Sequence, residues 1–186
     1  MSIPHLVKIK NEALRGNREL GKSNLTKYSW GNLSVIDPKR KYIAIKPSGI
    51  PYNKISINDI VVTDINGKII DGKKLPSTDL KTHIILYRSF KNINSICHTH
   101  SKYATIFCQA NKSIKCLGTT HADEFSGDIP ITRKLKKTEI MSDYVGNTGK
   151  VIFELFKLKK LDPLKIKAVL VSDHAPFVWG SDYKES

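Results

Sequence analysis

The spacing of apolar residues along this chain changes from a helical to a strand-like pattern after about 25 residues. Near the start, Leu6, Ile9 and Ala13 recur at helical intervals, which predicts a first helix over about residues 4–18. From Tyr28 onward, the segments YSWGNLSVID and YIAIKPSG have patterns typical of strands. We therefore expect a leading helix followed by β structure.

The segment IVVTDINGKIID contains the clearest turn signal of the chain. Asn66 and Gly67 separate two apolar runs there. A two-residue hairpin turn requires positive φ at both central positions, and Asn and Gly adopt that conformation most readily. This pattern predicts a β-hairpin with Asn66-Gly67 as its turn.

Further along, helical and strand-like segments alternate. Ser77, Thr78 and Asp79 are residues typical of helix N-caps, and they precede an apolar helical face that includes Leu80 and Ile84. The remaining patterns predict a strand at 95–98, a helix at 103–110, a loop-rich stretch to about 130, a helix through 151–158 and a strand at 168–171.

This order of elements mixes hairpins with crossovers, which decides the expected fold class. We expect an α/β domain of three α/β/α layers around a central, mainly antiparallel sheet, and not a doubly wound nucleotide-binding fold. With 186 residues, the chain is long enough to bury one substantial core, so a single domain over 1–186 is expected.

The formal net charge of +14 raises the question of a nucleic-acid partner. Only five of the 31 basic residues are arginine, the side chain best suited to bidentate phosphate and base contacts, and the lysines are scattered. We therefore expect no nucleic-acid binding and a basic surface that attracts an anionic substrate, with a lysine-rich RNA-binding module as a weaker alternative.

Hydrophobic and cysteine patterns indicate the expected compartment. The first twenty residues contain no uninterrupted apolar run, so a signal peptide is not expected, and no stretch is long and apolar enough for a membrane helix. Cys97, Cys108 and Cys116 are odd in number and lack CxxC spacing, which favours reduced thiols. A cytoplasmic protein without a membrane partner is the expectation.

The strongest candidate chemistry lies in His98-Thr99-His100 at the end of a predicted strand. Side chains at positions i and i+2 of a strand point to the same face, so the two imidazoles can reach one metal ion. A third histidine, His174, follows another predicted strand. Three neutral imidazoles leave a metal with a full positive charge and an open position for substrate, and zinc is the first choice among first-row metals.

Two further segments combine groups that bind anions. Lys46, Ser48 and Gly49 bring an ammonium, a hydroxyl and a backbone N–H together at a turn. Ser77 and Thr78 offer hydroxyls and N–H groups at a predicted helix start, where the helix dipole favours phosphate. Each motif alone is also an ordinary turn or cap, so its value depends on the metal site beside it.

Seven motifs in this order carry a resemblance to a known family: SWGNLS, IKPSG, LPSTD, HTHS, GTTHAD, IPITR and DHAPFVWG. Over residues 6–181 the chain resembles the L-ribulose-5-phosphate 4-epimerase family of the class II aldolase superfamily. The resemblance implies metal ligation by His98, His100 and His174, with Asp79 as an acidic residue at the metal. The substrate and phosphate contacts it implies are Gly31, Asn32, Ser48, Gly49, Ser77, Thr78 and Asp79.

The resemblance also implies a reaction and a catalytic residue. The family cleaves and re-forms the C3–C4 bond of a pentulose phosphate by retro-aldol and aldol steps, with one zinc ion per subunit. In this way L-ribulose 5-phosphate and D-xylulose 5-phosphate are interconverted, in arabinose or ascorbate catabolism. Asp123 in GTTHAD corresponds to one acid/base residue of the family. Family members are homotetramers with the site between neighbouring subunits.

Other interpretations of the same motifs stay open. Class II sugar-phosphate aldolases resemble the chain around the histidines but carry glutamate where Asp79 stands, which favours the epimerase. Family members also continue beyond the position of Ser186, through closing helices and a tyrosine that serves as the second acid/base group. A catalytically impaired remnant that binds metal and sugar phosphate is therefore a further expectation. We expect structural roles for His83 and His121, and packing roles for both tryptophans.

Overall fold

The computed structural model describes residues 4–186, which form seven strands and five α-helices in these described positions. Their bounds are α1 Pro4–Lys22, β1 Asn32–Ile36, β2 Tyr42–Ile45, a 3₁₀ turn η1 Tyr52–Lys54, β3 Val61–Asp64, β4 Ile69–Asp71, α2 Leu80–Ser89, β5 Ser95–His98, α3 Lys102–Gln109, α4 Thr119–Glu124, α5 Lys137–Leu158, β6 Ala168–Leu170 and β7 Pro176–Gly180. Within this range no helix combines the length and the apolar character that crossing a membrane requires.

All seven strands belong to one sheet in the order β4-β3-β2-β1-β5-β7-β6, and every neighbouring pair is antiparallel. The predicted mainly antiparallel sheet is therefore confirmed. Strand β5 lies between β1 and β7, so its last residue, His98, pairs with Asn32 on one side and Phe177 on the other. This register brings three distant parts of the sequence to one end of the sheet.

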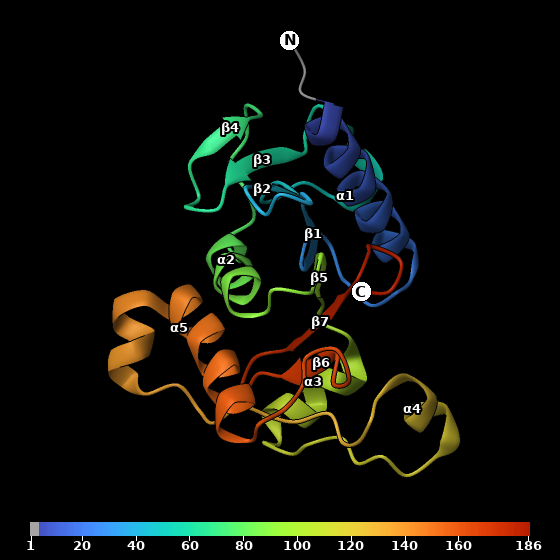
Figure 1. Cartoon of the computed structure of the whole chain (residues 1–186), viewed down its shortest axis with the longest axis vertical. Coiled ribbons are helices and arrows are strands. Elements are labelled where there is room, and N and C mark those ends of the chain that lie inside the picture. Colours follow the sequence, from blue (N-terminus) through green and yellow to red (C-terminus); the bar gives the residue numbers. More distant parts are fainter. Residues whose placement is uncertain (1–3) are drawn as a thin grey trace.

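Helices cover both faces of the sheet, as expected for three layers (Figure 1). Successive strand side chains point to opposite faces, and β2 shows the consequence. Ile43 and Ile45 pack with α2 and α5 in one core, whereas Ala44 packs with α1 in the other. On α1, residues such as Ile9 and Ala13 are almost fully buried, which accounts for the helical spacing seen in the sequence.

The hairpin of β3 and β4 forms as predicted, but its turn is different. Gly67 has a φ of 88°, whereas Asn66 is not at positive φ. The Asp64 carboxylate accepts hydrogen bonds from the amides of Asn66 and Lys68, and the Asp64 carbonyl accepts one from Gly67. The loop is therefore longer than a two-residue turn and ends in a left-handed glycine. It is stabilised by the Asp64 side chain, which accepts hydrogen bonds from two of the loop amides.

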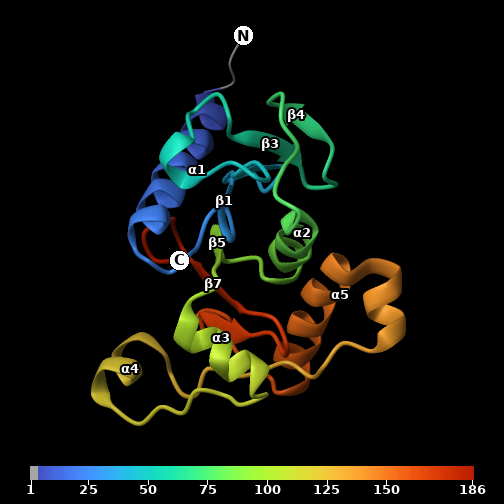
Figure 2. The ribbon, with the colours of Figure 1, turned by 180° about the vertical axis from the view of Figure 1, so that it is seen from behind.

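The C-terminal half departs from the predicted pattern in two places. The loop-rich stretch before residue 130 contains the short helix α4. Both views show this segment extending away from the sheet (Figures 1 and 2). Residues 176–180 form strand β7, which the sequence pattern did not separate from the strand before it. Its proline takes the first strand position, where no ladder N–H is required.

Candidate active site

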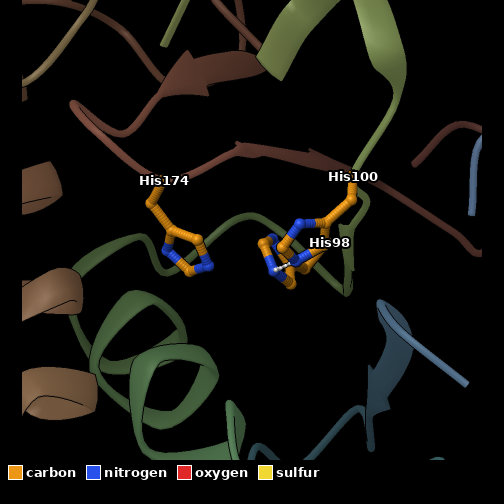
Figure 3. Close-up of side chains that lie close together, drawn as sticks. All are labelled: His98, His100 and His174. Atoms are coloured by element: carbon orange, nitrogen blue, oxygen red, sulfur yellow. Dashed lines mark hydrogen bonds between the residues drawn. The ribbon is translucent and has the colours of Figure 1, made fainter. Parts of the chain in front are cut away.

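Three histidines from separate segments converge at the end of the sheet (Figure 3). His98 ends β5, His100 lies just before α3, and His174 lies in the turn between β6 and β7. Since β7 pairs with β5, the turn that precedes β7 is brought beside the end of β5. One ring nitrogen from each histidine lies within 4.8 Å of the other two, so the predicted cluster is present.

The spacing of His98 and His100 fits two ligands of one tetrahedral metal ion. The Nδ1 atom of His98 lies 2.9 Å from the Pro176 carbonyl oxygen, which assigns the proton to Nδ1 and leaves Nε2 as the ligand atom. The Nε2 atoms of His98 and His100 are 3.2 Å apart. Two nitrogens bound to one tetrahedral zinc would be separated by about 3.3 Å, close to this value.

Burial sets the protonation state of the cluster. It lowers the pKa of His98 and His100, and together with the neighbouring His98 it lowers the pKa of His174 to about 4. At neutral pH the three rings are therefore uncharged, which is the form that binds metals.

The cluster forms part of a cavity of about 530 Å³. Its lining residues are Ser29, Trp30, Gly31, Lys46, Pro47, Ser48, Gly49, Ser77, Thr78, Asp79, His98, His100, Tyr144, Val145 and His174. Apart from Asn32 and Asp123, every residue predicted for the metal or the substrate lies on this wall. Asn32 is buried directly behind the wall, where its amide donates to Asp79 Oδ2 and Ser77 Oγ.

Two loops build the anion-binding side of the cavity. The loop after β2 and the loop before α2 are held together by backbone hydrogen bonds from Ser48 to Leu75 and from Ser77 to Lys46. Gly49 has a φ of 71°, a left-handed conformation that glycine adopts without strain. Ser48 and Gly49 of one loop and Ser77 and Thr78 of the other therefore line the same cavity.

Lys46 gives this side of the cavity a positive charge. Its side chain is almost fully buried, and its ammonium donates to the carbonyl oxygens of Ser29 and Pro47. Burial lowers its pKa to about 8. None of the salt bridges among residues 4–186 includes Lys46, so its ammonium has no carboxylate partner among the described residues.

Asp79 places a carboxylate beside the histidines without capping α2. It stands at the N-cap position, but its side chain makes no capping hydrogen bond and accepts one from Asn32 at 2.7 Å instead. Burial alone would raise the pKa of Asp79, but His98, His83 and the Asn32 amide outweigh it, and the pKa lies below its usual value. The carboxylate is outside the three-histidine group, so its role as a metal ligand stays a prediction.

Gly31 shows why a glycine stands next to this site. Its φ is 76°, and a Cβ atom there would lie 2.6 Å from the His98 carbonyl oxygen. A larger residue would therefore displace the strand end that carries the histidine.

Three lining residues were missed or misjudged from the sequence. Trp30 is 54% exposed, and its ring centroid lies 5.7 Å from that of His100, so the predicted packing role is wrong for Trp30 but right for the fully buried Trp179. Tyr144 and Val145 reach the cavity from α5, far from any motif in sequence. A break in that helix places them there, and nothing in the apolar spacing indicates it.

Asp123 is not brought to the cavity within this chain. It is an exposed residue of α4, the helix that lies apart from the sheet in Figures 1 and 2.

The two histidines for which a structural role was predicted, His83 and His121, lie outside the cavity wall and bond to other parts of the protein. His83 is fully buried, with Nδ1 bonded to the Ser34 hydroxyl, and His121 bonds the Gly127 carbonyl.

Together, the antiparallel three-layer fold, the histidine cluster at a strand end and the two serine-bearing loops beside it are the features expected of the class II aldolase type. The family model for the class II aldolase and adducin N-terminal domain matches residues 11–186, and the chain belongs to that family.

Individual relatives and solved structures agree with this family. L-ribulose-5-phosphate 4-epimerase UlaF of Salmonella typhi and of Salmonella paratyphi B are each 43% identical over 175 residues, which is 94% of this chain and 76% of the relative. An L-fuculose 1-phosphate aldolase structure has a TM-score of 0.78 at 28% identity, over 96% of this chain and 77% of that one. A sugar-phosphate aldolase from Thermotoga maritima has a TM-score of 0.73 at 17% identity, over 97% and 88%, which is a likeness of fold.

Proposed function

We propose that this protein is a zinc-dependent epimerase that interconverts L-ribulose 5-phosphate and D-xylulose 5-phosphate. The observation that carries the proposal is the single cavity in which three neutral histidines lie beside a buried, unpaired lysine and two anion-binding loops. The similarity to the two UlaF epimerases supports the choice of substrate. The supplying pathway would be arabinose or ascorbate catabolism.

His98, His100 and His174 would hold the zinc ion. The spacing of their nitrogens and their neutral state support this assignment. Bound there, the metal would act as a Lewis acid that polarises a substrate carbonyl and stabilises negative charge on the enediolate formed by cleavage.

The phosphate would be bound by Lys46, Ser48 and the start of α2 around Ser77 and Thr78. A dianion would pair with the buried ammonium and accept hydrogen bonds from the hydroxyls that line the cavity, close to the positive end of the α2 dipole. Holding the phosphate would keep the glycolaldehyde phosphate fragment in the cavity while it turns over between cleavage and re-addition.

Asp123 would act as an acid/base residue of a neighbouring subunit's site. Its exposure on α4 and the position of that helix away from its own sheet support a role across a subunit boundary. Leu117, which lies just before α4, is 90% exposed, as expected for an apolar residue in a contact surface between subunits. We therefore propose a homotetramer in which each site is completed by the next chain.

A class II sugar-phosphate aldolase is the second candidate, favoured by the structural similarity to L-fuculose 1-phosphate aldolase. The epimerase is preferred because Asp79 stands where aldolases carry glutamate, and the shorter side chain is drawn back by Asn32. A non-catalytic sugar-phosphate binder is the third. The free cysteines support a reducing, cytoplasmic compartment for each of them.

Two specificity constants separate these candidates. The zinc-loaded protein should epimerise L-ribulose 5-phosphate with a larger kcat/KM than that for cleavage of L-fuculose 1-phosphate. A larger value for cleavage would assign the protein as an aldolase. Binding of both sugar phosphates without any turnover would assign it as a binder.

A further inference from the structure

Helix α5 is broken next to the cavity, and the break has a visible cause. Asp143 has an extended conformation, with φ −161° and ψ 72°. Its carboxylate accepts a hydrogen bond from the Gly146 amide, three residues on, in the manner of an N-cap. The same carboxylate forms an ion pair with Lys81 of α2, with a separation of 2.6 Å. A new helical segment therefore begins at Tyr144.

The start of this segment is fixed against the active site. The Val145 carbonyl accepts a hydrogen bond of 2.6 Å from the Thr82 hydroxyl, which holds α5 to α2. Tyr144 and Val145 line the cavity, and the ring centroid of Tyr144 lies 5.7 Å from that of His174. Because Val145 is apolar, Tyr144 is the α5 residue on the cavity wall whose side chain carries a polar group.

A phenol in this position suits one task in particular. A phenol keeps its proton at neutral pH and acts as a hydrogen-bond donor, and burial raises the pKa of Tyr144 further. The anion-binding groups Lys46, Ser48 and Ser77 come from the loops after β2 and before α2, so α5 forms a separate wall beside His174. With the phosphate held at those loops as proposed above, a donor on this wall would lie toward the carbon skeleton of the sugar phosphate.

We propose that Tyr144 is a catalytic residue, whose hydroxyl donates a hydrogen bond to a substrate oxygen beside His174. This inference rests on the proposed function. When the C3–C4 bond breaks, its electron pair forms a C2–C3 double bond, and the π pair of the C2 carbonyl moves onto the carbonyl oxygen. The C4 hydroxyl loses its proton to a carboxylate base, for which Asp123 is proposed, and becomes an aldehyde. Tyr144 stabilises the charge that develops and keeps its own proton.

The test is Tyr144→Phe, with Tyr103→Phe as the matched control, because Tyr103 lies on α3 and is 75% exposed. Zinc content, melting temperature, kcat and KM for L-ribulose 5-phosphate are measured for each. Isothermal titration of the zinc-loaded proteins then gives affinities for acetohydroxamate, which presents charged oxygens to a metal, and for inorganic phosphate.

Loss of one donor to developing charge should lower kcat by about 10²–10³-fold with little change in KM. Acetohydroxamate should bind Tyr144→Phe about tenfold or more weakly, while phosphate affinity, zinc content and the control variant stay at wild-type values. Wild-type kcat and hydroxamate affinity in Tyr144→Phe would overturn the inference. A loss of zinc would also overturn it, by showing that Tyr144 supports His174.

The hydroxamate titration separates this inference from the proposed function. If the wild-type protein turns over no pentulose phosphate but Tyr144→Phe still weakens hydroxamate binding, the epimerase proposal fails. The hydrogen bond from Tyr144 to a ligand beside His174 is then supported.

Discussion

At the scale of single residues, the histidine cluster depends on which ring nitrogen is free. The Nδ1–H of His98 donates a hydrogen bond to the Pro176 carbonyl oxygen, which leaves Nε2 free beside His100 and His174. We expect His98→Ala to lose most of the bound zinc, because two imidazoles hold a metal far less well than three. Elemental analysis measures this, with His121→Ala as the control. Equal zinc in wild type and His98→Ala would exclude these ligands.

Lys46 gives a second residue-scale prediction, in the pH dependence of phosphate binding. Because burial lowers its pKa to about 8, the charge is present below that pH and is lost as the pH rises through it. Between pH 7 and 9.5, phosphate affinity of the metal-free protein should therefore fall. Titration calorimetry of Lys46→Met should give weaker binding that changes little over this range. An equally steep fall in Lys46→Met would assign the pH dependence to another group.

The residue scale also shows what the sequence could not reveal about the site. Histidine spacing, the two anion-binding motifs and the family resemblance together identified most of the cavity wall, because these residues lie on loops at strand ends. Tyr144 and Trp30 were not identified. Tyr144 is placed by a break in α5, and Trp30 by a turn that leaves its ring exposed. Neither a helix break nor a turn produces a regular spacing of apolar residues in the sequence.

At the scale of elements, most helices and strands were predictable, because burial on one face imposes a regular spacing. The structure departs from these predictions where a side chain, and not a backbone carbonyl, accepts the hydrogen bond of a backbone amide. Asp64 sets the turn of the β3–β4 hairpin, and Asp143 ends one part of α5 and begins the next. Strand β7 was missed because only pairing with β5 and β6 separates it from the preceding turn.

The break in α5 can be tested through stability. Asp143→Ala removes the cap of the second helical segment and should lower the free energy of unfolding by about 0.5–2 kcal/mol. Asp143→Asn keeps a good cap but loses the partly exposed ion pair with Lys81, which is worth less than about 1 kcal/mol. Urea denaturation compares the two variants. Equal losses in both would assign the stabilisation to the ion pair and not to the cap.

At the scale of the whole molecule, the separation of Asp123 from its own cavity predicts complementation between inactive chains. His98→Ala supplies an intact Asp123, and Asp123→Asn supplies intact histidines. When the two are mixed and reassembled, random association should restore about a quarter of the sites in a ring-like tetramer. Turnover by the mixture, with each variant alone inactive, is the expected result. An inactive mixture of correctly assembled tetramers would place Asp123 outside the active site.

The most direct test of the central claim follows the fate of L-ribulose 5-phosphate by NMR with the zinc-loaded wild-type protein. We predict conversion to D-xylulose 5-phosphate without accumulation of dihydroxyacetone and glycolaldehyde phosphate. Removal of zinc should stop the conversion, and its return should restore it. An unchanged substrate, or the two fragments as main products, would contradict the account.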